Sequence, residues 1–352
     1  MADAAAYPLV SIIMPVRNEA GFIARTLGAV LDQDYPPDRM EILIIDDGST
    51  DDTRAVIAGL PGAERVRILD GPGGLVPRAL NMGLRTARGD IVIRVDGHAA
   101  IAPDYVRRCV ERLQSGEADN VGGRWIIRGK TPIEQAIAAA MTSPFGVGGA
   151  QWRHSTLPRE TDTVPFGAYW REALLRLGGF DERLVRNQDY ELNWRLRAAG
   201  GRILYDPAIY SIYHVKRDWR GLWRQYYQYG MWKARVIRMH PHSWRWRHLV
   251  APAFVGGMIG SAVLAIVLRP ARWLLAAGLL SYALAALIMA ALTAARRGWR
   301  HLPRLPLIFA VLHISWGLGF WRGLFMPRLE PLPVPDRLYE SQRGRDAASP
   351  PG

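Results

Sequence analysis

Cysteine is almost absent from the sequence, because only Cys109 occurs among 352 residues. A single cysteine excludes an internal disulfide and any cysteine metal cluster. The N-terminus lacks the charged start and the long apolar region of a secretory signal peptide, since Ala4 to Ala6 lead directly into a strand pattern. We therefore expect the first half of the chain to remain in the cytoplasm.

Acidic residues are fewer than basic ones, and the two halves of the chain differ in composition. The sequence has 45 Lys and Arg against 32 Asp and Glu, a net charge of +13. This excess suits nucleic acid, anionic lipid or a phosphorylated ligand equally well, so the positions of the charges must decide. Up to about Trp246 the pattern is that of a soluble α/β protein, and long uncharged runs follow.

The N-terminal half alternates between strand and helix patterns. Runs of β-favouring residues occur at 9–14, 42–45, 66–69 and 91–95. The first run ends at Pro15, and segments with helical spacing separate the runs. This order is typical of a mostly parallel sheet with right-handed crossovers. Ligands of such sheets bind at the carboxyl ends of the strands, where Glu19, Asp47 and Asp96 would project.

The triplet Asp96-Gly97-His98 follows the buried strand pattern at 91–95. A carboxylate and an imidazole at the carboxyl end of a central strand can hold a divalent cation against a phosphate. The alternative is that Asp96 and Gly97 form an ordinary turn and His98 is a solvated loop residue.

Two loops lie beside this triplet in the predicted sheet. In 46–53, helix capping by Ser49 or Asp51 explains part of the pattern, and Asp47 is the better candidate for binding a nucleobase. The loop is not a calcium loop, because Ile57 stands where the closing glutamate is required. The glycine-rich 71–74 has neither a Walker nor a dinucleotide-binding motif, so we interpret it as a flexible loop near the nucleotide.

Two later segments also carry candidate site residues. Gln151, Trp152 and Arg153 lie in a glycine-rich stretch that suits contact with a sugar or a phosphate, although a plain surface loop explains them equally well. Gln188 and Asp189 open a helix, where acidic residues favour the helix dipole and where a catalytic base could also stand.

Taken together, these residues resemble the inverting family 2 glycosyltransferases with the GT-A fold, and within them the membrane-bound bacterial exopolysaccharide enzymes of the succinoglycan type. The resemblance covers about 9–232 and rests on the motifs at 15–19, 46–51, 96–98, 178–182 and 188–189. It implies a nucleotide-sugar donor, a divalent cation (Mg²⁺ or Mn²⁺) on the donor diphosphate, and one carboxylate that deprotonates the acceptor hydroxyl.

The resemblance also implies roles for individual residues. Asp189 would be the general base, and Asp96 would lie on the metal or ribose side. By its chemistry, His98 or His214 could help Asp96 to hold the metal, and the alternative for His214 is a structural histidine. Donor-binding residues would be Pro15, Arg17, Glu19, Asp47, Arg78 and Asp96, and acceptor-side residues would be Gln151, Trp152, Arg153, Gln188, Gln228 and Trp232. The chain departs from the family's Asp-x-Asp at His98. It also lacks the arginine that processive synthases carry between Gln228 and Trp232, which argues against polymer synthesis.

The chemistry of transfer requires such a set of groups. The departing diphosphate must be stabilised electrostatically, which a metal at Asp96 would do. A base on the side opposite the leaving group, as expected for Asp189, gives inversion.

The C-terminal part has the pattern of a membrane segment. Basic and aromatic residues alternate in 219–247; single-stranded nucleic acid is one ligand for such a pattern, but the uncharged run that follows favours an amphipathic interfacial segment and no nucleic acid. Apolar spans are expected at 249–268, 273–295 and 305–321. The basic cluster 296–300 should face the cytoplasm, as the catalytic half does.

The sequence thus predicts a catalytic domain at 1–218, an interfacial segment at 219–247, a membrane region at 248–326 and a disordered tail at 327–352. We expect a multi-pass protein of the inner or plasma membrane that transfers a sugar, with UDP as the expected nucleotide, to a polyprenyl-linked acceptor. A nucleotidyltransferase and a non-catalytic scaffold that binds a sugar nucleotide are the alternatives.

Overall fold

The computed structural model describes residues 7–148, 155–215 and 218–339. The chain forms two compact units. Unit 1 comprises Met1–Ile126, Ser155–Tyr213 and Leu332–Gly352, and unit 2 comprises Ile127–His154 and His214–Pro331. The described residues 127–148 therefore group with the C-terminal helices, whereas the sequence placed them in a catalytic domain at 1–218. The predicted acceptor contacts Gln151, Trp152 and Arg153 lie outside the described residues.

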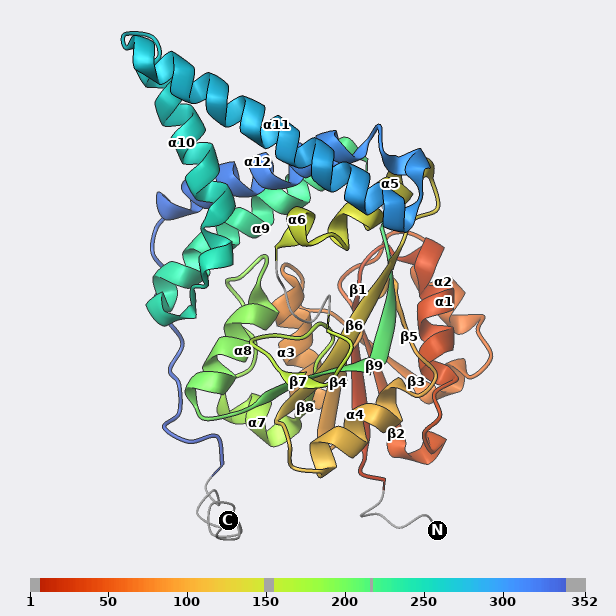
Figure 1. Ribbon diagram of the computed structural model, residues 1–352. Coiled ribbons are helices and arrows are strands. Elements are labelled where there is room, and N and C mark those ends of the chain that lie inside the picture. Colours follow the sequence, from red (N-terminus) through yellow and green to blue (C-terminus); the bar gives the residue numbers. More distant parts are fainter. Residues whose placement is uncertain (1–6, 149–154, 216–217, 340–352) are drawn as a thin grey trace, which may run out of the picture. The chain divides into compact units, whose positions relative to one another are not determined.

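Unit 1 is built on a mixed β-sheet (Figure 1). Its strands are β1 (Val10–Val16), β2 (Met40–Asp46), β3 (Val66–Asp70), β4 (Ile91–Arg94), β5 (Ala99–Ile101), β6 (Asn120–Arg128), β7 (Arg159–Glu160), β8 (Ala168–Trp170) and β9 (Ile203–His214). The strand order is β3-β2-β1-β4-β8-β6-β9-β5, with β7 on β9. The first four strands are parallel, and the pairs from β8 onward are antiparallel.

The central parallel strands β1, β2 and β4 are buried along nearly their whole length, because helices cover them. The helices of unit 1 are α1 (Ala20–Leu31), α2 (Thr53–Ala58), α3 (Val76–Thr86), α4 (Tyr105–Gln114), α7 (Arg171–Arg176) and α8 (Gln188–Ala198), with short 3₁₀ turns at Pro37–Arg39 and Ala63–Arg65. In α1, Ile23, Leu27 and Val30 are fully buried at helical spacing. Strand β1 continues one residue past Pro15, whose fixed φ is compatible with an extended chain near a strand end.

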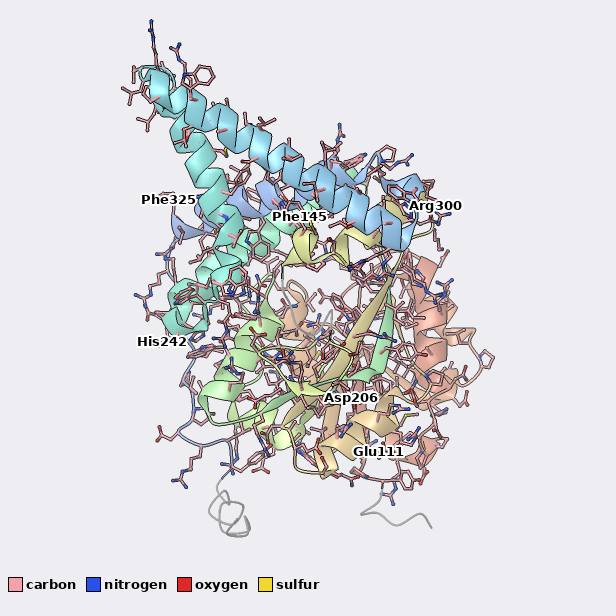
Figure 2. All side chains as sticks on the ribbon, viewed as in Figure 1. Glu111, Phe145, Asp206, His242, Arg300 and Phe325 are labelled. Atoms are coloured by element: carbon pink, nitrogen blue, oxygen red, sulfur yellow. The ribbon has the colours of Figure 1, made fainter. Side chains whose placement is uncertain are left out.

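Unit 2 is helical. Its helices are α5 (Pro132–Met141), α6 (Pro144–Val147), α9 (Trp219–Met239), α10 (Val250–Leu264), α11 (Arg269–Arg297) and α12 (Leu305–Leu324), with 3₁₀ turns at Pro241–Ser243, Trp246–His248 and Trp299–His301. Helices α9 and α12 touch through their backbones, since a Cβ on Gly319 would lie 2.0 Å from the Tyr227 carbonyl oxygen. Phe145 on α6 (Figure 2) packs edge-on against Phe309 of α12.

The expected interfacial segment forms helix α9, which is partly buried. Trp232 is 6% exposed and Lys233 is 4% exposed, whereas Arg220 and Arg224 are exposed. Arg238 donates to the Leu324 carbonyl oxygen at 2.9 Å, so it caps the last turn of α12. Much of this segment therefore packs within unit 2.

Two helices among the described residues are long and apolar enough to cross a membrane, α11 and α12. Helix α11 is 29 residues long with 11% of its apolar window buried, and 44% of the corresponding window of α12 is buried. The first expected span, 249–268, is corrected: α10 has only 15 residues, and the chain turns after Leu264. A 15-residue helix rises about 22 Å, which is less than the roughly 30 Å hydrocarbon core of a bilayer.

The chain after Pro327 has no regular secondary structure as far as Tyr339. Nevertheless Leu338 is 0% exposed and Tyr339 is 9% exposed. The sequence did not predict this burial, because Leu338 and Tyr339 are only two apolar residues and form no periodic hydrophobic pattern.

Candidate active site

One arginine joins the two carboxylates expected to do the chemistry. Arg94, the last residue of β4, donates through Nε to Asp96 at 2.8 Å and through Nη1 to Asp189 at 2.5 Å. The Arg94 side chain is 10% exposed, and those of Asp96 and Asp189 are 24% and 36% exposed. The structure thus brings together Asp96 and Asp189, which lie 93 residues apart in the sequence.

The two carboxylates differ electrostatically. Burial raises the pKa of Asp189, and the negative charge of Asp96 adds to this rise while Arg94 opposes it. At Asp96 burial acts in the same direction, but the charges of Arg94 and His98 outweigh it and hold the pKa of Asp96 below its usual range. Asp96 therefore suits a permanently ionised metal ligand, and Asp189 suits a base that takes up a proton.

His98 pairs with Glu19, so two predicted residues meet. The His98 Nδ1 lies 2.9 Å from the Glu19 Oε1, and the imidazole packs edge-on against Tyr213. A Cβ on Gly97 would lie 3.0 Å from the Glu19 Cγ, so glycine permits this close approach. A histidine that binds metal commonly donates its other ring N–H to a carboxylate, which is the arrangement that Glu19 offers.

Asp47 organises the glycine-rich loop. Its Oδ1 accepts a hydrogen bond from the Gly73 N–H at 2.7 Å, and its own N–H donates to the Val16 carbonyl at 2.9 Å. The neighbouring Asp46 is buried and pairs with Arg54. The two aspartates thus differ: Asp46 stabilises the turn, and Asp47 follows the carboxyl end of β2. The role of Asp47 in binding a nucleobase remains a prediction.

The rest of the 46–53 loop has a structural role. Asp51 Oδ1 accepts from the Thr53 N–H at 3.1 Å, and the Asn18 Oδ1 accepts from the Thr50 N–H at 2.8 Å. Asn18 has a left-handed backbone (φ 54°). These bonds fix the loop after β1 against the loop after β2.

The remaining predicted donor contacts lie on the same loops and helices of unit 1. Pro15 pairs with Ile45 in the ladder of β1 and β2, and Arg17 is exposed just beyond it. Arg78 is in the first turn of α3, with its Nε 3.8 Å from the Glu182 Oε2. These positions agree with a donor site at the strand ends, and the roles remain predictions.

Helix α8 holds Asp189 in place through buried polar bonds. Gln188 is 7% exposed, and Asn187 before it has φ 63°. Arg195 is fully buried: its Nε donates to Glu191 at 2.7 Å and its Nη2 to the Gly179 carbonyl at 2.7 Å. The motif at 178–182 therefore serves to anchor α8.

Three predicted residues belong to unit 2. His214 ends β9, Gln228 is half-buried on α9, and Trp232 is buried with the Arg235 guanidinium 4.4 Å above its ring. Their roles in metal or acceptor binding remain predictions. The burial of Trp232 favours a packing role.

Arg94 is the functional residue that the sequence reasoning missed. A signal was available: Arg94 and Asp96 are two residues apart at the end of a strand, so their side chains share one face. An arginine in an otherwise apolar strand requires a buried partner.

The side chains present can bind a divalent cation only if substrate phosphates supply further ligands. Within residues 7–148, 155–215 and 218–339, no group of three or more His, Cys, Asp or Glu side chains is placed to hold a metal. Asp96 and His98 offer two ligands, and Mg²⁺ or Mn²⁺ in phosphate-transferring sites is commonly bound by one or two protein ligands plus substrate phosphates. The arrangement therefore fits a metal that arrives with a diphosphate.

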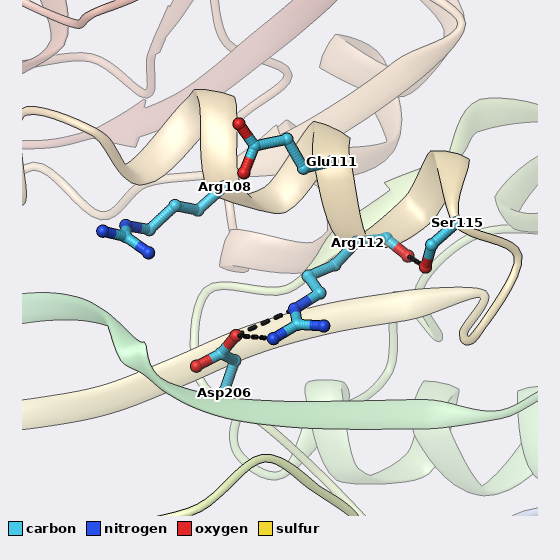
Figure 3. Close-up of a pocket in the computed structure, with 5 residues that line it drawn as sticks. All are labelled: Arg108, Glu111, Arg112, Ser115 and Asp206. Atoms are coloured by element: carbon cyan, nitrogen blue, oxygen red, sulfur yellow. Dashed lines mark hydrogen bonds and ion pairs between the residues drawn. The ribbon is translucent and has the colours of Figure 1, made fainter.

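A small cavity of about 170 Å³ lies on the flank of unit 1, away from these residues (Figure 3). It is lined by Arg108, Glu111, Arg112, Ser115 and Asp206 on α4 and β9. Arg112 donates to Asp206 at 2.9 Å (Figure 3), so its charge is already neutralised. The cavity includes none of the predicted site residues.

The chain is similar to several known proteins. The model of the family described as Glycosyl transferase family 2 matches residues 11–178. The succinoglycan biosynthesis protein ExoA of Rhizobium meliloti (strain 1021) is 30% identical over 316 residues, 89% of this chain and 94% of that protein. The dolichyl N-acetyl-alpha-D-glucosaminyl phosphate 3-beta-D-2,3-diacetamido-2,3-dideoxy-beta-D-glucuronosyltransferase of Methanococcus voltae is 29% identical over 65% of this chain and 74% of its own length. The solved structure of the mannosyltransferase PcManGT from Pyrobaculum calidifontis, in complex with GDP-Man and Mn²⁺, is similar with a TM-score of 0.60. The similarity covers 86% of each chain at 23% sequence identity, and it shows a shared fold.

Proposed function

Since the chain belongs to glycosyl transferase family 2, we propose that it transfers a sugar, with inversion, from a nucleotide-sugar donor to a lipid-linked acceptor. The family membership and the GT-A fold confirm the resemblance read from the sequence. The observation that carries the proposal is the pair of carboxylates joined by Arg94, one suited to a metal and one to a base.

Each carboxylate has its own task in the proposed reaction. Asp189 accepts the proton of the acceptor hydroxyl, and the hydroxyl oxygen attacks the anomeric carbon of the donor. The bond to the nucleoside diphosphate breaks on the opposite face, so configuration inverts. Asp96 and His98 would hold the divalent cation, which supplies electrostatic stabilisation of the departing diphosphate. Glu19 orients His98, and Asp47 orders the loop that would flank the nucleotide.

The acceptor is proposed to be a polyprenyl-linked saccharide, with UDP-sugar as the expected donor. The relative from Methanococcus voltae is named for a dolichyl phosphate glycan, and that from Rhizobium meliloti for succinoglycan biosynthesis. Arg220 and Arg224 on α9 are exposed and are candidates for contact with the acceptor or anionic lipid, whereas Lys233 on the same helix is buried.

The proposed location is a membrane whose cytoplasmic face carries unit 1, with the apolar helices of unit 2 inserted. Support comes from the exposed apolar surface of α11, on which Leu280 is 72% and Leu284 is 57% exposed. Phe325, which ends α12, is also exposed (Figure 2).

The experiment that tests the function supplies purified protein with a panel of sugar nucleotides and polyprenyl-linked acceptors and identifies lipid products by mass. Addition of one sugar to the lipid supports the proposal. Release of free diphosphate instead of nucleoside diphosphate selects a nucleotidyltransferase, and donor binding without turnover selects a scaffold.

A further inference from the structure

We propose that Arg94 is a positioning residue that holds the base Asp189 in a fixed relation to the metal-binding Asp96. The inference rests on the proposed function, because it concerns the same reaction. It goes beyond that function by identifying which residue couples the donor side of the site to the acceptor side.

The geometry of the guanidinium carries the inference. Arg94 uses two different nitrogens, Nε for Asp96 at 2.8 Å and Nη1 for Asp189 at 2.5 Å. Both nitrogens belong to one rigid plane, so the two carboxylates cannot shift independently while both bonds persist. A base must lie within hydrogen-bond reach of its proton, and an error of about 1 Å can cost a hundredfold in rate.

The backbone that presents Arg94 is itself rigid. Strand β4 is buried along its whole length and lies between β1, its parallel neighbour, and β8, its antiparallel neighbour. Arg94 is paired in register with Ile13 of β1. Arg94 thus fixes the position of the Asp189 side chain, on helix α8, relative to the centre of the sheet.

Helix α8 does not depend on Arg94 for its attachment. Asn193 accepts through Oδ1 from Asn120 at 2.8 Å and from Tyr169 at 3.0 Å, and Arg195 binds Glu191 and the Gly179 carbonyl. These buried bonds lie one and two turns beyond Asp189. The hydrogen bond from Arg94 therefore orients only the Asp189 side chain, because other bonds already hold helix α8 in place.

Replacing Arg94 with lysine distinguishes the effect of the positive charge from the effect of the guanidinium geometry. A single ammonium keeps the positive charge between Asp96 and Asp189, but it lacks the planar fork that holds both at once. Arg94→Lys should therefore retain donor binding while losing the alignment of the base. Arg94→Met removes both the charge and the bonds.

The test measures kcat, donor KM, calorimetric donor affinity and the thermal midpoint for Arg94→Lys and Arg94→Met, each alone and combined with Asp189→Asn. For Arg94→Lys we expect a thermal midpoint and a donor affinity close to wild type and a fall in kcat of about tenfold to a hundredfold. In the Asp189→Asn background the same change should have almost no further effect on kcat, because the base it positions is gone.

A matched control is Arg112→Lys, which alters an arginine–aspartate pair with Asp206 outside the site. It should leave kcat unchanged. The inference is overturned if Arg94→Lys has wild-type kcat, or if its loss is undiminished in the Asp189→Asn background. Failure of the wild-type protein to transfer any sugar would instead refute the proposed function, and wild-type activity of Asp189→Asn would refute both.

Discussion

At the scale of single residues, the site works by placing chemically similar groups in different surroundings. Asp96 and Asp189 share Arg94, yet the charges around Asp96 lower its pKa while burial raises that of Asp189. Opposite shifts suit the opposite tasks proposed for the two carboxylates, since a metal ligand must stay ionised and a base must exchange a proton. Glu19 pairs with the Nδ1 of His98, so Nε2 is the ring nitrogen with which His98 would bind a metal.

Replacement of Asp96 should affect donor binding first. In Asp96→Ala the cation loses its carboxylate ligand, so the added affinity that Mn²⁺ or Mg²⁺ gives to donor binding should disappear. Calorimetry of donor with and without the metal measures this difference, and chelation of the metal should mimic the mutation in wild type. Unchanged metal-dependent affinity in Asp96→Ala would refute the assignment.

The pH dependence of the rate should report the raised pKa of Asp189. The base acts only when ionised, so activity is present above its pKa and is lost as pH falls through it. Because burial raises that pKa, the acid limb of the kcat profile should lie at a higher pH than for an ordinary aspartate. A limb at or below the ordinary aspartate range would contradict this account.

At the scale of elements, the site depends on how α8 is fastened to the loop at 178–182. Arg195 and Glu191 form a fully buried ion pair, and Arg195 also donates to the Gly179 carbonyl. A buried charge without its partner is strongly destabilising. The glycine motif of the family thus contributes to function indirectly, by placing the helix that carries Asp189.

Arg195→Met should lower the free energy of unfolding by about 3–5 kcal/mol, because it removes the cation that pairs with the fully buried Glu191 carboxylate. Thermal unfolding in detergent measures the effect. Arg176→Met is the matched control: Arg176 and Glu172 have the same i,i+4 spacing, but the Glu172 side chain is 61% exposed. Such exposed pairs contribute about 0–1 kcal/mol. Equal effects of the two variants would show that burial of the pair is not what matters.

The sequence predicted some of these elements and missed others. The parallel strands and their loops follow from runs of apolar residues, and β1, β2 and β4 lie close to the expected ranges. Strand β8 has only three residues, too few for a periodic signal, yet it pairs directly with β4 beside the site. The bond from Arg94 to Asp189 spans 95 residues, and no local pattern predicts contact over that distance.

At the scale of the whole molecule, the chain joins a catalytic unit to a helical unit with an apolar surface. Arg296 and Arg297 end α11, the more exposed of the two candidate spans, and Arg300 follows it. By the positive-inside rule these cations favour the cytoplasmic face. We propose that α10, too short to cross by itself, and α11 enter the bilayer from this face and return to it as a hairpin, so that the loop after α11 and unit 1 lie on the same face.

The lone cysteine makes this topology testable by labelling. Cys109 is fully buried and burial raises its pKa, so it should react slowly, and Cys109→Ser removes it. In that background, Arg300→Cys should react with a membrane-impermeant maleimide in inverted vesicles and stay unlabelled in intact cells. Labelling in intact cells would place the loop outside and contradict the topology.

The most direct test of the central claim compares product formation by the wild-type protein and by Asp189→Asn. We predict that wild type releases one nucleoside diphosphate per sugar transferred and that nuclear magnetic resonance shows the opposite anomeric configuration in product and donor. Asp189→Asn keeps the shape of the side chain but cannot accept the proton, so transfer should fall about a hundredfold to ten-thousandfold while donor affinity stays nearly unchanged. Retained configuration in the wild-type product, or near-normal transfer by Asp189→Asn, would contradict the account.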